Sequence, residues 1–299
     1  MNILVTGGEG FIAKKLISRL IKEGHNVISL DRKETTSLDI KKTEDIVADL
    51  SNENLFFDML DESIDYIFHL AAQSGGYYSL KDPYTDGKWN CLGTLNVVKL
   101  AQKLKVKKLI YASSMAVYGN QELVSEEHSK HDPISFYGVS KFTGELYTKL
   151  VYEHSNIPYT IFRLFTTYGS GQDLNNKHQG ILSIYLDQAL NKDTIEITGS
   201  KDRVRELVHV DDVVEALMLS FNSKTNNEIY NVSNSEHLTP EIIIKEISEA
   251  LDKPLKIKEL EGYKGDQTYI TSTTHKLQNL GWSPTFNIKD GIKEFINNL

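Results

Sequence analysis

A tyrosine and a lysine stand four residues apart near the middle of the chain, as Tyr137 and Lys141. On a helix, residues at i and i+4 share one face, so the two side chains would be neighbours. An ammonium beside a phenol favours the phenolate and lowers the phenol pKa from about 10. A phenolate near neutral pH can act as a general base toward a substrate hydroxyl. Because both residue types are common on helices, this pair alone is a weak signal.

Two serines, Ser113 and Ser114, close a segment that reads as a strand over residues 108–113. In a doubly wound parallel sheet, ligand-binding groups gather at the carboxyl ends of the strands. A hydroxyl at such an end can hydrogen-bond the same reacting oxygen as the phenol. The serines therefore favour a proton-transfer site at Tyr137.

A glycine-rich segment near the N-terminus could hold phosphates. Gly8, Gly10 and Ala13 fit the dinucleotide fingerprint G-x-G-x-x-G/A, after a predicted strand at 3–6 and at the start of a predicted helix at 11–22. The pattern supplies a tight turn and a close approach of the backbone to pyrophosphate. The free N–H groups at the helix start would face the phosphates.

An acidic residue follows the glycines at the expected distance. Asp31 lies 21 residues after Gly10, at the end of the second predicted strand. A carboxylate there accepts hydrogen bonds from ribose hydroxyls and repels a 2′-phosphate, so we expect NAD as the cofactor. Arg32 leaves NADP open, since an arginine can hold that phosphate.

Short apolar strands alternate with longer helical patterns over the first half of the chain. Such alternation predicts a parallel sheet covered by helices on both faces. The expected fold class is α/β, a doubly wound parallel sheet (Rossmann-like) with a smaller C-terminal α/β substrate-binding region. The predicted strands are 3–6, 26–30, 45–48, 66–70, 108–113 and 159–164, and the predicted helices are 11–22, 85–104 and 136–154.

The last third of the chain has shorter strands and a different order of elements. Helical patterns there cover 181–190, 213–221 and 240–251, with strands at 195–197 and 228–232. We predict a dinucleotide-binding domain at 1–165 and a mainly substrate-binding region at 166–299, with a segment near 205–222 packing back on the first domain.

Composition narrows the class of protein. Of 299 residues, 40% are hydrophobic and 25% charged, which is typical of a soluble globular protein. A net charge of −8 disfavours nucleic-acid binding, and blocks of Lys or Arg that seek anionic membranes are absent. The single cysteine, Cys91, excludes an intramolecular disulfide and a Cys-based zinc site. We expect a cytoplasmic protein with no nucleic-acid, membrane or metal partner.

Ordered motifs along nearly the whole chain resemble those of the extended short-chain dehydrogenase/reductase family. Within it, the chain is similar to the NAD-dependent nucleotide-sugar epimerases and dehydratases, with a UDP-glucose 4-epimerase-like pattern. The motifs are TGGEGFIA at 6–13, Asp49 with Leu50, HLAAQ at 69–73, NxxGTxN at 90–96, SSMAVYG at 113–119, YGVSKxxxE at 137–145, RLFxxYG at 163–169, RELVHVDDV at 205–213 and GWxP at 281–284.

The resemblance implies roles for individual residues. Ser114 is then the catalytic hydroxyl and Tyr137 the acid/base, while Lys141 orients the nicotinamide ribose and lowers the pKa of Tyr137. Arg205 clamps the substrate diphosphate, a task that suits a planar guanidinium. The helices at 85–104 and 136–154 form a dimer interface in relatives, so a homodimer is implied.

The remaining site residues fall into two sets. The expected cofactor contacts are Gly7, Gly10, Phe11, Ile12, Asp31, Arg32, Asp49, Leu50, Leu70, Ala71, Ala72, Gln73, Asn90, Ser113, Tyr137, Lys141 and Phe165. The expected substrate contacts are Gln73, Ser74, Tyr77, Ser114, Thr166, Arg205 and Tyr269.

Some positions depart from the family pattern. The sugar dehydratases carry an Asp-Glu pair directly after the catalytic hydroxyl, where this chain has Met115 and Ala116. Neither side chain can move a proton, which argues against elimination. Thr166 and Ser170 replace the Asn and Pro of the family where substrate usually sits, so the pocket need not copy a known one.

The expected activity is that of an NAD-dependent nucleotide-sugar 4-epimerase, and the expected substrate is a UDP-hexose. The reaction would proceed by transient oxidation at C4 and return of hydride to the other face. One alternative is a net NAD(P)-dependent oxidoreductase, either a 4-keto reductase or a C4 dehydrogenase, on a nucleotide-linked sugar. A more distant alternative is a non-catalytic dinucleotide-binding protein. For His69 we expect a structural role satisfied by the backbone, and for Asp211 with Asp212 a helix N-cap rather than a metal site.

Overall fold

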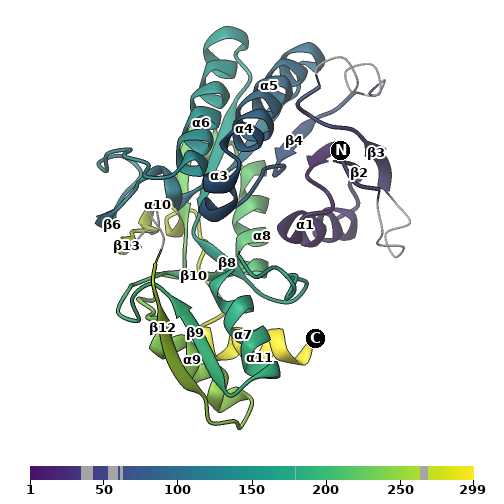
Figure 1. Cartoon of the computed structure of the whole chain (residues 1–299). Coiled ribbons are helices and arrows are strands. Elements are labelled where there is room, and N and C mark those ends of the chain that lie inside the picture. The colour runs from purple at the N-terminus through teal and green to yellow at the C-terminus, as the bar shows by residue number, and fades with distance from the viewer. Residues whose placement is uncertain (35–42, 53–59, 61–62, 179, 263–268) are drawn as a thin grey trace.

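Seven parallel strands form the central sheet, in the order β11-β7-β5-β4-β1-β2-β3 (Figure 1). The computed structural model describes residues 1–34, 43–52, 60, 63–178, 180–262 and 269–299. This strand order confirms the predicted doubly wound α/β fold. The strands are β1 (Asn2–Thr6), β2 (Asn26–Asp31), β3 (Thr43–Val47), β4 (Tyr66–His69), β5 (Lys108–Ser114), β7 (Tyr159–Leu164) and β11 (Glu228–Val232).

Apolar side chains bury both faces of this sheet. Alternate residues of β1 point to opposite faces, so Ile3 and Val5 enter one core cluster and Leu4 enters the other. The first cluster includes α1 (Phe11–Lys22) and α8 (Val210–Met218). The second includes α5 (Gly93–Leu104) and part of α6 (Phe136–Ser155). Strands that are apolar on both sides follow from this double burial.

The predicted helix at 85–104 is three segments in the structure. A short helix α4 (Pro83–Asp86) runs into a π-helical turn η1 (Gly87–Leu92), and α5 continues from there. Single π-turns inside helices are rare and often occur at functional sites. Here the turn carries Lys88, Trp89 and Asn90 toward the sheet edge where the candidate site lies.

Helix α6 has clear start and stop signals. The Ser135 hydroxyl accepts a hydrogen bond from the Gly138 N–H at 3.1 Å, which caps the first turn. Asn156 ends the helix in the left-handed conformation, with φ of 55°. A Cβ on Gly144 would lie 2.1 Å from the Tyr111 hydroxyl, so this glycine lets α6 pack closely on β5.

The C-terminal part of the chain packs around its own apolar cluster, which Figure 1 places at the far end from α5 and α6. Among the described helices, none has the length and hydropathy that a bilayer crossing needs. The further elements are α3 (Gly76–Lys81), β6 (Gln121–Val124), β8 (Thr166–Tyr168), α7 (Ile181–Asn191), β9 (Thr194–Thr198), β10 (Leu207–His209), α9 (Pro240–Ala250), β12 (Lys256–Leu260), β13 (Ile270–Ser272), α10 (His275–Gln278), α11 (Ile288–Asn297) and the 3₁₀ turns η2 (Met115–Val117), η3 (Leu219–Phe221) and η4 (Ser223–Thr225).

The chain returns to the first domain after residue 166. Strand β11, which the sequence analysis grouped with the C-terminal region, pairs in parallel with β7 at the edge of the central sheet. Val208, Val213 and Leu217 lie in the core cluster formed with β1 and α1. The pairing of β11 with β7 joins segments far apart in the chain, so the sequence of β11 alone does not show which strand it pairs with. The division at 165/166 stays a prediction.

Candidate active site

Three hydroxyl groups from three elements meet at the C-terminal edge of the sheet. Tyr137 lies in the first turn of α6, and its hydroxyl hydrogen-bonds the side chains of Ser114 and Ser74. Ser114 is the last residue of β5, and its Oγ also accepts a hydrogen bond from the Ala116 N–H at 3.2 Å. Ser74 comes from the segment between β4 and α3. Such a cluster can share and move a proton.

The ionisation of Tyr137 differs from the expectation. Burial raises the pKa of Tyr137, and the negative charge of Asp86 raises it further, while the hydrogen bonds with Ser114 and Ser74 lower it. The pKa of Lys141 is itself lowered to about 7, because burial of the ammonium outweighs the nearby carboxylates. Lys141 is thus partly neutral near pH 7, and the lowered Tyr137 pKa that we expected from it is not found.

Lys141 lies one helical turn below Tyr137 and is only 3% exposed. Its Nζ sits over the Tyr111 ring, 4.3 Å from the centroid. Burial lowers its pKa, whereas Glu145, Asp86 and Cys91 raise it. Only a small environmental change is needed to move such a group between its charged and neutral forms near pH 7.

A buried ion pair anchors α6 beneath the candidate site. Arg163 on β7 donates to both carboxylate oxygens of Glu145, with Nε–Oε1 at 2.8 Å and Nη2–Oε2 at 2.7 Å. Ser113 also donates to Glu145 Oε1, at 2.6 Å. The Ser113 hydroxyl, which we expected at the cofactor, is therefore part of this anchor.

Asn90 fixes the segment that follows β4. Its Oδ1 accepts the Gln73 N–H at 2.7 Å, and its Nδ2 donates to the Gln73 carbonyl at 3.0 Å. The same Nδ2 contacts Asp86 Oδ1 and Ser140 Oγ, each at 3.0 Å. The side chain of Asn90, expected to touch the cofactor, is engaged inside the protein. Asp86 was not among the predicted site residues, although its i, i+4 spacing to Asn90 was a usable signal.

The glycine-rich turn fits a pyrophosphate cradle. Gly7 has φ of +74°, and a Cβ there would lie 2.7 Å from the backbone of Ala71. Gly10 is the N-cap of α1 and supplies no side-chain cap, so N–H groups of the first turn remain available to a ligand. Phe11 and Ile12 open the helix. Gln73 Oε1, nearby in sequence to Ala71, is a buried acceptor with no hydrogen-bond partner among the described residues. These features suit bound NAD.

The ends of β2 and β3 form the expected adenosine end of the cradle. The Asp31 carboxylate accepts the Glu9 N–H at 3.1 Å. The Arg32 guanidinium lies over the Trp89 ring, 3.7 Å from its centroid. A hollow of about 400 Å³ opens beside them and is lined by Asp49, Ser51, Asn52, Lys88 and Leu92.

The Asp49 carboxylate lines that hollow and remains ionised. Burial raises its pKa, but hydrogen bonds from Ser51 and the charges of Lys88 and Arg32 give a net lowering. Ser51 donates from both its hydroxyl and its backbone, at 2.7 and 2.9 Å. A fixed negative charge here suits a ribose or an adenine amine better than a phosphate.

Other predicted cofactor residues lie along the same sheet edge. The Leu70 N–H donates to the Thr6 carbonyl at 3.2 Å, and the Leu50 carbonyl accepts from Asn96 at 2.8 Å. Ala72 is exposed. Phe165 instead packs in a buried cluster with Val117 and Tyr118, so its ring serves the core.

His69 is structural, as expected, but its partners are side chains and not the backbone. Its Nδ1 pairs with the Thr6 hydroxyl at 2.7 Å and its Nε2 with the Thr94 hydroxyl at 2.9 Å. Burial, with a smaller contribution from the charge of Lys141, lowers the His69 pKa to about 3. The ring is therefore neutral at physiological pH.

The predicted substrate residues occupy two sides of the site. Tyr77, on α3, stacks on His178 with ring centroids 4.0 Å apart. Thr166 begins β8, which pairs with β10. Arg205 is buried and its backbone pairs with Leu238. Tyr269 bridges to Val204, so Tyr269 and Arg205 lie on neighbouring segments.

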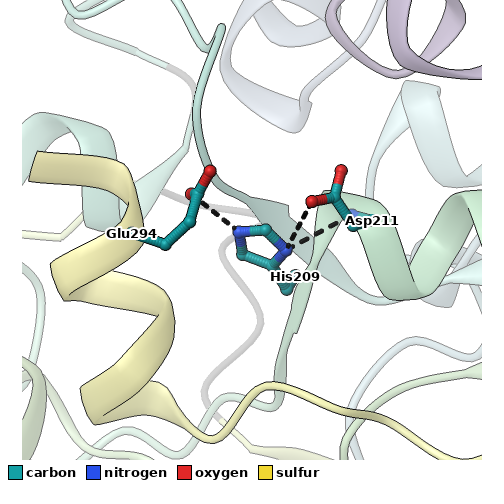
Figure 2. A group of neighbouring side chains, drawn as sticks. All are labelled: His209, Asp211 and Glu294. Atoms are coloured by element: carbon teal, nitrogen blue, oxygen red, sulfur yellow. Dashed lines mark hydrogen bonds and ion pairs between the residues drawn. The ribbon is translucent and has the colours of Figure 1, made fainter. Parts of the chain in front are cut away.

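A separate polar cluster joins α8 to α11 (Figure 2). His209, Asp211 and Glu294 are potential metal ligands within 4.8 Å of one another. Both ring nitrogens of His209 are engaged, since Nδ1 accepts the Asp211 N–H at 3.3 Å and Nε2 lies 3.0 Å from Glu294. His209 is thus the N-cap of α8, and the expected cap by Asp211 and Asp212 is wrong. Absence of a metal stays a prediction.

Ser170, a departure from the family pattern, belongs to the same cluster. Its hydroxyl accepts from Lys15 at 2.9 Å and donates to Glu294 at 2.8 Å. Lys15 also lies 3.6 Å from Asp211. This substitution therefore serves a contact between α1 and α11.

Known proteins resemble this chain over nearly its whole length. A relative from Methanocaldococcus jannaschii, a putative UDP-glucose 4-epimerase, is 34% identical over 99% of this chain and 97% of its own. The UDP-glucose 4-epimerase of Thermotoga maritima, solved with UDP-glucose, superposes with a TM-score of 0.94 at 29% identity, covering 100% of this chain and 98% of its own. The UDP-glucose 4-epimerase of Thermus thermophilus, solved with NAD, gives a TM-score of 0.91 at 28% identity, with coverage of 100% and 98%.

The family model that matches is described as the NAD dependent epimerase/dehydratase family, and it spans residues 3–233. The match includes the glycine-rich turn, the strand-end serines and Tyr137 with Lys141. It confirms the predicted family and the use of NAD. The chain therefore belongs to the NAD-dependent epimerase/dehydratase family.

Proposed function

We propose that this protein is a nucleotide-sugar 4-epimerase that acts on a UDP-hexose. The observation that carries the proposal is the meeting of the Tyr137, Ser114 and Ser74 hydroxyls at the sheet edge that also bears the dinucleotide cradle. A sugar hydroxyl placed there would have a proton acceptor on one side and a hydride acceptor on the other. The UDP-glucose seen in a structural relative supports the substrate class.

The proton is moved by this chain's own residues. Tyr137 takes the proton of the sugar 4-hydroxyl and later returns one to the re-formed hydroxyl. Ser114 holds the reacting oxygen by a hydrogen bond, and Ser74 holds the phenol. Lys141 orients the nicotinamide ribose from the same helix face. NAD, when bound, supplies the hydride chemistry at C4.

The residues that follow Ser114 favour a reaction without elimination. Met115 and Ala116 begin the 3₁₀ turn η2 directly after Ser114. Loss of water from the sugar needs a proton donor near the leaving hydroxyl, and these side chains offer none. This supports a redox-neutral epimerisation.

The C-terminal region is proposed to hold the nucleotide half of the substrate. Arg205 would clamp the diphosphate, with Tyr269 on the adjoining segment and Thr166 at the start of β8. Tyr77 and Gln73 would contact the sugar from the first domain. A guanidinium is well suited to a diphosphate because it donates bidentate hydrogen bonds.

We further propose that the protein is a homodimer through α6 and its neighbours. Phe136, Val139, Leu146 and Leu150 are 51%, 50%, 45% and 45% exposed, and the last three share one face of α6. Exposed apolar stripes of this kind mark protein interfaces. Leu146→Glu should give a monomer by light scattering, and a variant that stays dimeric would contradict this interface.

The test of the function is proton NMR of the purified protein with UDP-, dTDP-, GDP- and CDP-hexoses and no added cofactor. The proposal predicts a new anomeric signal from a 4-epimer in a UDP-hexose sample. A reaction that requires stoichiometric NAD(P)⁺, or a 4-keto sugar with NAD(P)H, would instead support the net oxidoreductase.

A further inference from the structure

A buried carboxylate lies beside the proposed catalytic residues and has no role in the mechanism above. Asp86 is the last residue of α4, directly before the π-helical turn, and is 1% exposed. Its Oδ1 accepts a hydrogen bond from Asn90 Nδ2 at 3.0 Å, and Ser140 on α6 also hydrogen-bonds its side chain. Burying an ionised carboxylate costs free energy, so a buried Asp86 suggests a role beyond packing.

Asp86 is connected to Tyr137 by a short chain of contacts. The amide of Asn90 that it binds also holds the Gln73 backbone by two hydrogen bonds, at 2.7 and 3.0 Å. Ser74 follows directly and hydrogen-bonds the Tyr137 hydroxyl. Holding Asn90 therefore fixes the segment that presents Ser74 to the phenol.

A second path runs through α6 itself. Ser140 Oγ accepts from Asn90 Nδ2 at 3.0 Å, and its single hydroxyl proton is shared between the Tyr137 carbonyl, 3.0 Å away, and the Asp86 carboxylate. Asp86 is thus linked through Asn90 to the loop on one side of Tyr137, and it contacts the helix that carries Tyr137 at Ser140. Removing it would loosen two of the supports that set the position of the phenol.

Asp86 differs from Glu145, the other carboxylate near Lys141, in having no hydrogen-bonded cation among the described residues. Glu145 is paired in a bidentate manner with Arg163. Among the described residues, the hydrogen-bond partners of Asp86 are Asn90 and Ser140, which are neutral. Burial raises the pKa of Asp86, whereas the hydrogen bond with Ser140 and the charge of Lys141 lower it. When Asp86 is ionised, its charge acts on Lys141 and Tyr137 without a cation hydrogen-bonded to it among the described residues.

We propose that Asp86 is a positioning residue of the catalytic centre, which holds Asn90 and the Gln73–Ser74 segment against Tyr137 and places a carboxylate beside Lys141. This inference rests on the proposed function insofar as Tyr137 and Lys141 are its acid/base pair. It adds a residue from α4 to a set that otherwise comes from β5, α6 and the segment after β4.

The charge has a consequence for pH dependence. Asp86 raises the pKa of Tyr137 and of Lys141, so removing its charge should lower both. An activity profile that reflects these two groups would then shift to lower pH as a whole. Within the described part of the chain, the titratable and charged groups that face this pair are Asp86 from α4, Cys91 from η1, Glu145 from α6, Tyr111 from β5 and His69 from β4.

Two variants separate the hydrogen bond from the charge. Asp86→Asn keeps an acceptor oxygen for Asn90 and removes the charge, and Asp86→Ala removes both. Asp82→Asn is the matched control. Asp82 is the exposed N-cap residue of the same helix, where its carboxylate accepts the Thr85 N–H, and its substitution removes the same charge as Asp86→Asn. Each is measured as the purified holoenzyme by kcat, KM and the pH profile, with thermal unfolding and NAD content as checks on folding.

We expect Asp86→Ala to lower kcat by about 10²-fold with little change in KM, the loss typical of a misplaced catalytic group. Asp86→Asn should lose less and should shift the pH profile to lower pH, and Asp82→Asn should match the unmodified protein. Full kcat in Asp86→Ala, or an unshifted profile in Asp86→Asn, would overturn the proposal.

A second readout does not depend on the substrate. The near-ultraviolet absorbance of tyrosinate, taken as the difference between each protein and its Tyr137→Phe counterpart, reports the ionisation of Tyr137 alone. We expect this titration to move to lower pH in Asp86→Asn, and an unmoved titration would contradict the proposal. If no nucleotide sugar reacts, the proposed function fails while this titration still decides the role of Asp86. Asp86→Asn is nearly isosteric and keeps the test available if Asp86→Ala does not fold.

Discussion

Tyr137 is a partly buried residue, and desolvation of its phenol raises the pKa, so the surroundings hold its proton more firmly than water would. Ser114 and Ser74 oppose that effect by hydrogen bonding, and Lys141 contributes little because its own pKa is lowered to about 7 by burial. The expected pairing of the two residues on one helix face is present, but their ionisation follows from desolvation. Sequence spacing can predict a neighbour, whereas desolvation depends on everything that packs around it.

Tyr137→Phe removes the hydroxyl that would move the proton and keeps the ring. We expect kcat to fall by about 10²–10⁴-fold, the usual contribution of a general acid/base, with unchanged NAD content. Tyr152→Phe, a partly exposed tyrosine on the same helix, is the control and should keep full activity. Steady-state assays of both variants on the same sugar would check this, and a Tyr137→Phe enzyme with full turnover would exclude the mechanism.

At the scale of elements, α6 carries Tyr137 and Lys141, the proposed acid/base pair, and is held by a buried ion pair. Arg163 is the largest fully buried side chain among the described residues, and it binds Glu145, the Tyr118 hydroxyl at 2.8 Å and His131 at 2.7 Å. Glu145 in turn accepts from Ser113 on β5. This pair ties the helix of Tyr137 and Lys141 to two strands of the sheet.

Arg163→Met should leave Glu145 buried without its cation. We expect a loss of about 3–5 kcal/mol in the free energy of unfolding, the range found when one member of a buried pair is removed. Urea denaturation of the holoprotein measures it. Adding Glu145→Gln to Arg163→Met should recover part of the loss, and a cost below about 1 kcal/mol in the single variant would show that the pair is not an anchor.

The strands and main helices were predictable because their apolar periodicity is local. The helix at 85–104 was predicted as one element, yet residues 87–92 form a π-turn, because the extra residue in a turn leaves no mark in the apolar spacing. That turn is what brings Asn90 and Trp89 to the site, so the contact of the Arg32 guanidinium with the Trp89 ring could not be predicted from sequence. The place of β11 in the sheet was missed for a related reason, since strand pairing is non-local.

For the whole molecule, the buried His69 links folding to pH. Its pKa is lowered to about 3 in the folded protein, against an ordinary value near 6.5. Below pH 6.5 the unfolded chain takes up a proton that the folded chain refuses, so stability present above that pH is lost as the pH falls toward 3.

The variant His69→Gln should lack this pH dependence. Between about pH 6 and pH 4, the unfolding free energy of the unmodified protein should fall more steeply than that of the variant, by about 1.4 kcal/mol per pH unit. Urea denaturation at a series of pH values gives both slopes. Parallel slopes would mean that His69 is protonated in the folded protein.

The predicted sheet follows from local patterns in the first 165 residues, and the predicted family follows from motifs along nearly the whole chain, of which the family model matches residues 3–233. The C-terminal region is harder to predict, because its pairs β8–β10, β9–β12 and β6–β13 join segments far apart in sequence. The placement of Arg205 and Tyr269 on neighbouring segments depends on those pairings.

The central claim, that C4 of a nucleotide sugar is oxidised and reduced again within one site, is tested most directly with a UDP-hexose deuterated at C4. The purified protein is incubated with it in ordinary water, and the product is followed by NMR. We predict that the 4-epimer forms and keeps its deuterium at C4, because the hydride leaves and returns without meeting solvent. Loss of deuterium to water, or its accumulation in reduced cofactor, would contradict the account.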